Sequence, residues 1–98
     1  MTPSNSKLNS GEKQALREMK TDFPKVKLAN NGVTTIAFVE SIDTVEFSLA
    51  VASKVELRFR RKVGEYLALT RYLEDKTVKM DKFDFYDMLE NTGMTYTN

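Results

Sequence analysis

Three runs in the first half of the chain alternate hydrophobic and polar residues with a period of two, the pattern of half-buried strands. They are centred on Val26 and Leu28, on residues 33–40 and on residues 44–52. Asn-Gly between apolar alternations is a strong hairpin signal, and Asn30-Asn31-Gly32 separates the first two runs. Ser41-Ile42-Asp43 separates the second and third. The sequence therefore predicts an antiparallel meander of three strands.

Hydrophobic residues with helical spacing flank this meander. A first helix is predicted from Ser10 to Asp22, with Asn9 as its N-cap and Glu12 completing a capping box. A long helix is predicted over residues 53–75, and Asp81 is expected to cap a last helix that ends near residue 90. Residues 77–80 between them favour a short fourth strand.

These elements predict an α+β fold with the order α-β-β-β-α-(β)-α. We expect one domain over residues 9–91, with flexible ends at 1–8 and 92–98. In this interpretation all helices pack on one face of the sheet, and the other face, with Glu46, Ser48 and Ala50, is open to solvent or a partner. The predicted core includes Phe47, Leu49, Phe59, Val63 and Leu67.

The composition excludes several kinds of chemistry. The chain has 98 residues with no cysteine and no histidine, so disulfides, thiolate metal sites, His-ligated metals and Ser-His-Asp or Cys-His nucleophiles are excluded. We expect no enzymatic activity, no metal and no cofactor. The 15 basic and 14 acidic residues nearly balance, so binding of a polyanion would need a local basic patch. No signal peptide or membrane span is visible, which predicts a cytoplasmic protein.

A basic cluster at the start of the long helix provides the candidate binding site. Arg58, Arg61 and Lys62 share one face at helical spacing, while Phe59 and Val63 point inward. Cations near a helix N-terminus interact unfavourably with the helix dipole, which favours acidic residues there. A departure from this preference can indicate an anionic partner such as phosphate. The alternative is a solvated helix face with favourable i,i+4 ion pairs.

Acidic residues recur every three positions in the last helix, at Asp81, Asp84, Asp87 and Glu90. Because this spacing winds around a helix, the carboxylates are not expected to converge on a metal ion. Most aromatic residues lie at predicted core positions. Phe83 is the exception, since it is expected to face away from Phe85 and Met88.

Residues 44–52 and 59–66 resemble small uncharacterised proteins of tailed phages. The resemblance implies no function. If the chain is derived from a phage, its expected location is the cytoplasm of the host. The order helix, three strands, helix is also that of double-stranded-RNA-binding domains, which carry a basic cluster at the start of the second helix. This chain departs from those domains in its tight Asn-Gly turn and its lack of histidine. The likeness is therefore one of fold only.

Two functions are predicted. The first is a small non-enzymatic accessory protein that contacts nucleic acid or another anionic partner through Arg58, Arg61 and Lys62. The alternative is a protein–protein adaptor or homo-oligomer that uses the open sheet face, or that pairs its basic helix with the acidic helix of a second chain.

Overall fold

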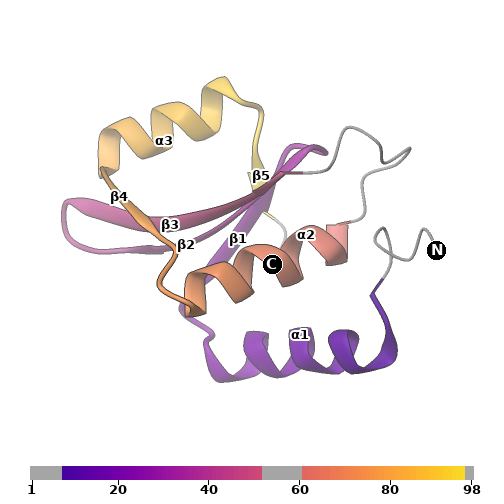
Figure 1. Cartoon of the computed structure of the whole chain (residues 1–98). Helices are drawn as coiled ribbons and strands as arrows, with labels where there is room; N and C mark the ends of the chain where they lie inside the picture. Colours follow the sequence, from indigo (N-terminus) through magenta and orange to yellow (C-terminus); the bar gives the residue numbers. More distant parts are fainter. Residues whose placement is uncertain (1–7, 52–60, 97–98) are drawn as a thin grey trace.

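The strands form one antiparallel sheet with helices on both of its faces (Figure 1). The computed structural model describes residues 8–51 and 61–96. Within these ranges the elements, in chain order, are α1 (Ser10–Asp22), β1 (Lys27–Asn30), β2 (Thr34–Glu40), β3 (Thr44–Val51), α2 (Arg61–Leu73), β4 (Val78–Asp81), α3 (Lys82–Asn91) and β5 (Thr95–Tyr96). The strand order across the sheet is β4-β3-β2-β1-β5.

The predicted α+β class and the meander of β1, β2 and β3 are confirmed, and Phe38 stands opposite Phe47 in the register of β2 and β3. The first turn is tight, with Asn31 and Thr34 joined by a backbone hydrogen bond of 3.2 Å. Gly32 has a φ of 88°. A positive φ at the first central position is typical of hairpin turns whose twist matches that of the strands, and glycine adopts it without strain.

Two short strands extend the sheet beyond the predicted three. β4 pairs with β3 and corresponds to the optional strand predicted over residues 77–80. β5 pairs with β1 through Ala29 and Asn30, so the ordered structure continues past residue 91. A strand of two residues has no periodicity to detect in a sequence. At the other end Leu8, predicted to lie in a flexible segment, is buried in the core.

The helix ends follow the local sequence signals. The Asn9 side chain accepts a hydrogen bond from the Glu12 backbone (2.8 Å), and the Glu12 carboxylate accepts one from the Asn9 backbone (3.0 Å). This is the predicted capping box of α1. Asp81 caps α3 by accepting from the Phe83 backbone at 3.0 Å. Gly93, with a φ of 71°, follows the end of α3 in the left-handed conformation that favours glycine.

The prediction that all helices share one face of the sheet is wrong. Leu16 of α1 and Leu69 of α2 pack with Leu28, Ala37 and Ala50 on one face. On the other face, Phe85 and Leu89 of α3 pack with Ala29, Ile36, Phe38, Val45 and Phe47. Figure 1 shows α3 above the sheet and α1 and α2 below it. Both faces therefore carry a hydrophobic cluster.

The face that was predicted to be open is the one that α2 covers. Ser48 and Ala50 are buried, and the Ser48 hydroxyl donates a hydrogen bond of 2.7 Å to the Ala68 carbonyl of α2. Glu46 is half-buried and accepts a hydrogen bond from the Thr77 hydroxyl. A sheet face lined by small and polar residues thus admits a helix at close range.

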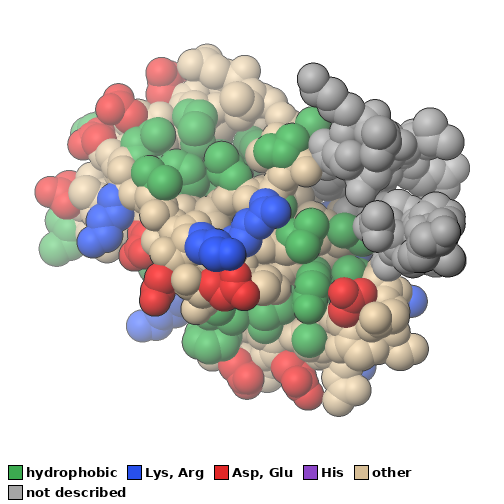
Figure 2. Space-filling view, in the orientation of Figure 1, with side chains coloured by type: hydrophobic (Ala, Val, Ile, Leu, Met, Phe, Trp, Pro, Cys, Tyr) green, Lys and Arg blue, Asp and Glu red, His purple; other side chains and the backbone are tan. Residues whose placement is uncertain are grey.

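The exposed part of the α3 face lies beyond the reach of that helix. A helix of 10 residues is only about 15 Å long, and Leu49 (41% exposed) and Val51 (61% exposed) lie past it on β3. Figure 2 shows hydrophobic side chains gathered on the surface between α3 and α2. Leu49 of β3 and Leu67 of α2, for which core positions were predicted, are both exposed. Phe59 lies outside the described residues.

Phe47→Ala is expected to lower the free energy of unfolding by about 3–5 kcal/mol, because truncation leaves a cavity beside the Phe85 ring. The two ring centroids are 5.3 Å apart and Phe47 is buried. Denaturant unfolding measures the change. Leu49→Ala on the same strand serves as the control, and equal losses in the two variants would contradict this core.

Tyr72 makes the stability depend on pH at the alkaline end. Burial raises the pKa of its phenol above the ordinary value, and the charges of Glu46 and Asp75 raise it further. The folded state therefore binds the phenol proton more tightly than the unfolded state does. As pH rises above about 10 the phenol loses this proton, and the free energy of unfolding falls. Between about pH 9 and pH 11, the free energy of unfolding should fall less in Tyr72→Phe than in the unmodified protein. Equal falls would contradict the assignment.

Candidate anion-binding site

One face of α1 is basic because Lys13, Arg17 and Lys20 follow one another at spacings of four and three residues. Residues at these spacings lie on the same side of a helix. Leu16 lies on this side as well, and it is buried in the contact of α1 with α2. The cations therefore lie where one helix meets the other.

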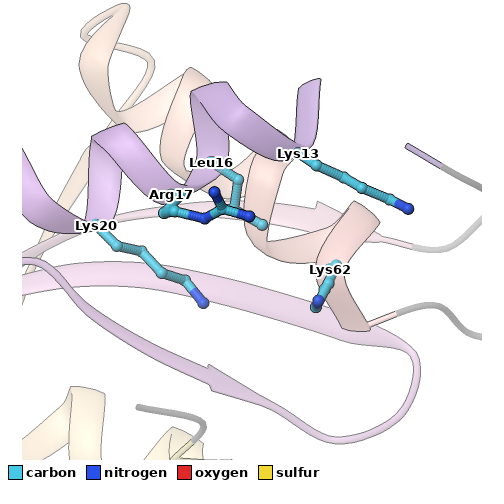
Figure 3. Close-up of a pocket in the computed structure, with 5 residues that line it drawn as sticks. All are labelled: Lys13, Leu16, Arg17, Lys20 and Lys62. Atoms are coloured by element: carbon cyan, nitrogen blue, oxygen red, sulfur yellow. The ribbon is translucent and has the colours of Figure 1, made fainter. Parts of the chain in front are cut away.

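These side chains line a hollow, which we call the basic hollow, with a volume of about 170 Å³. It is lined by Lys13, Arg17 and Lys20 of α1, by Lys62 from the first described turn of α2, and by the largely buried Leu16 (Figure 3). The volume is below the range of about 300–1,000 Å³ for pockets that hold drug-sized molecules. The hollow itself therefore has room for one phosphate group or one side chain of a larger partner, and not for a whole drug-sized ligand.

A buried carboxylate lies behind the basic hollow. Glu65 of α2 has no exposed surface, and its Oε1 atom accepts a hydrogen bond of 2.7 Å from Lys20 Nζ. Its Oε2 atom lies 3.9 Å from Arg61 Nε and has no hydrogen-bond partner in the described part of the chain. Lys20 and Arg61 are thus both drawn towards one negative charge, and this ion pair connects α1 to α2.

The other cations of the hollow are not neutralised in this way. Within residues 8–51 and 61–96, Lys13, Arg17 and Lys62 form no ion pair with a carboxylate. Like charges gathered without partners repel one another and disfavour the compact state. A local arrangement that opposes folding in this way is typical of a functional site.

The structure describes two of the three residues that the sequence proposed as the site, and it gives them different surroundings. Arg58 lies outside the described residues. Arg61 is directed to Glu65, whereas Lys62 lines the hollow together with residues of α1. The prediction missed the contribution of α1. The helical spacing of Lys13, Arg17 and Lys20 is visible in the sequence. It indicates a shared site with Lys62 only once α1 is known to pack beside the start of α2.

The acidic residues of α3 do not form a metal site in the described part of the chain. Asp81 caps the helix as predicted, and Asp84, Asp87 and Glu90 are exposed. Among the described residues, carboxylates form no group of three or more that could hold a metal ion. Phe83 is 86% exposed, as predicted from its position relative to Phe85.

Comparison of the chain with protein-family models, curated proteins and solved structures finds no match. Among the helices of the described ranges, none has the length and apolar character needed to cross a membrane. Functional inference therefore depends on the geometry of the basic hollow.

Lys20→Met is expected to lower the free energy of unfolding by about 1–3 kcal/mol, because it leaves the Glu65 carboxylate buried without its hydrogen bond. The double variant Lys20→Met/Glu65→Met should be less destabilised than Lys20→Met alone, since no buried charge remains. Lys13→Met, on the same helix face without an ion pair, should change stability by no more than about 0.5 kcal/mol. Equal effects of Lys20→Met and Lys13→Met in denaturant unfolding would contradict the role of the pair.

Proposed function

We propose that this protein is a small non-enzymatic binding protein that holds the phosphate backbone of a nucleic acid along the basic hollow. The observation that carries the proposal is the convergence of Lys13, Arg17, Lys20 and Lys62 on one hollow, with three of the four unpaired in the described structure. Phosphate oxygens are the partners that such cations contact in nucleic-acid complexes.

The spacing of the cations favours an extended anion over a single small one. Lys13 and Lys20 are seven residues apart, which corresponds to about 10 Å along the helix axis. One strand of duplex DNA carries a charge about every 3.4 Å along its axis, so this distance spans about three phosphates. A row of cations on α1, continued by Lys62, matches a backbone that passes along the helix junction.

A binding role agrees with the residues that surround the hollow. Lysine and arginine supply positive charge and hydrogen-bond donors, but these walls carry no carboxylate, hydroxyl or imidazole to accept a proton from a substrate. Contacts of this kind read the backbone and carry no base information, so the binding is expected to be independent of sequence.

Replacing Lys13, Arg17 and Lys62 together by alanine should remove most of the affinity for nucleic acid and most of its dependence on salt. For the unmodified protein, three phosphate contacts give a slope of log affinity against log salt of about −2 to −3. The measurement is fluorescence anisotropy of labelled single-stranded DNA, duplex DNA and duplex RNA between about 50 and 200 mM salt.

The matched control is the triple variant Lys25→Ala/Lys76→Ala/Lys79→Ala, which removes three exposed cations that do not line the basic hollow. It changes the net charge by the same amount as the triple variant of the hollow. It should retain the affinity and slope of the unmodified protein apart from a small nonspecific loss. Circular dichroism checks that both variants are folded, as expected because substitutions at exposed surface positions each change stability by only about 0.5 kcal/mol. Absence of binding at low salt, or equal losses in the two triple variants, would overturn the proposal.

A further inference from the structure

Two of the largest exposed hydrophobic side chains lie at the same end of the molecule. Ile42, in the turn between β2 and β3, is 96% exposed, and Phe83, in the first turn of α3, is 86% exposed. The Lys82 backbone donates a hydrogen bond of 3.0 Å to the Asp43 carbonyl. This bond extends the ladder of β3 and β4 by one step beyond Thr44 and Asp81, so Ile42 and Phe83 are each one residue past a bonded pair.

Hydrogen bonds fix the backbone of the β2–β3 turn and of the start of α3 in the unbound chain. A backbone hydrogen bond of 2.8 Å between Ser41 and Thr44 closes the turn. The Asp81 side chain caps α3 at Phe83. Side chains on a fixed frame lose less conformational entropy on binding than those on a mobile segment. The backbone positions that carry the pair are therefore preformed.

Three carboxylates and one lysine lie beside this apolar pair in the chain. Asp43 follows Ile42, Asp84 follows Phe83, and Asp81 precedes Phe83 by two residues with Lys82 between them, so the charge near the pair is negative on balance. We call Ile42, Asp43, Asp81, Phe83 and Asp84 the acidic knob. Figure 2 shows acidic and hydrophobic side chains at the end of the molecule formed by the β2–β3 turn and the start of α3. Exposed apolar groups rimmed by charge are typical of protein interaction surfaces.

The acidic knob and the basic hollow are complementary. The knob carries three carboxylates and one lysine beside its two exposed apolar side chains, and the hollow is lined by Lys13, Arg17, Lys20 and Lys62 around the buried Leu16. Opposite potentials on two surfaces steer their association and fix its register. α3 and α1 lie on opposite sides of the sheet (Figure 1). One chain therefore cannot bring its own knob to its own hollow.

We propose that the acidic knob of one chain docks against the basic hollow of a second copy, which places the carboxylates of the knob beside the cations of the hollow and the apolar pair against the surrounding surface of α1. Because the contact joins two different surfaces, it is heterologous and leaves a free knob and a free hollow at the ends of every assembly. The chains then associate head to tail. Nucleic acid and a neighbouring chain compete for the same cations.

Sedimentation velocity at low and high salt tests the proposal with two surface variants. The knob variant is Ile42→Ser/Phe83→Ser, and the hollow variant is Lys13→Ala/Arg17→Ala/Lys62→Ala. The unmodified protein should form species larger than a dimer as its concentration rises at low salt. It should dissociate at about 1 M salt, where the Debye length is only about 3 Å. Each variant alone should associate at least about tenfold more weakly, since removal of central apolar or paired charged groups has effects of this size.

Mixing the two variants is the decisive step. The knob variant retains a hollow and the hollow variant retains a knob, so an equimolar mixture should form a one-to-one complex that cannot grow further. A monomeric unmodified protein, a mixture that stays monomeric, or a knob variant that associates like the unmodified protein would each overturn the proposal. The knob variant should bind nucleic acid at least as tightly as the unmodified protein, because a neighbouring chain no longer competes for the cations; this distinguishes failure of this contact from failure of the nucleic-acid proposal.

Discussion

Burial of β2 on both faces is the constraint on which the arrangement of the other elements depends. Residues 35–38 of this strand are buried without interruption. Because successive side chains of a strand point to opposite faces, such a run requires a cover on each side of the sheet. α1 and α2 cover one side, and α3 must therefore lie on the other. This division also places the basic hollow and the acidic knob on opposite sides of the sheet.

The ion pair between Lys20 and Glu65 connects this packing to the chemistry of the surface. A carboxylate with no exposure is unfavourable unless its charge is matched, and Lys20 matches it from the neighbouring helix. The pair fixes the rotation of α1 about its axis, because only one face of the helix presents Lys20 to Glu65. The same rotation carries Lys13 and Arg17 to the hollow. An interaction made inside the fold thus aligns the charges that lie outside it.

Features determined within a few residues were predictable from the sequence, and features determined by packing were not. The cap at Asn9 depends on a side chain and a backbone three residues apart, so its pattern is local. The alternation around Phe47 correctly predicted its burial but does not encode which helix covers it. For the candidate site, Lys62 was found because it lies in a basic run. Its meeting with Lys13 and Arg17 results from contact between helices about 45 residues apart in the chain, which no local pattern contains.

The Arg71 side chain protects the part of the β3 edge that β4 does not cover. Asp43 directs its carbonyl towards β4, and alternate residues of a strand direct their backbone groups to the same side, so Leu49 also presents its carbonyl there. β4 pairs only with residues 44–47 of β3 and leaves this carbonyl without a strand partner among the described residues. The Arg71 guanidinium donates to it at 2.8 Å. An incoming strand would have to displace a charged side chain, so this margin is protected against the edge-to-edge pairing through which exposed strands aggregate.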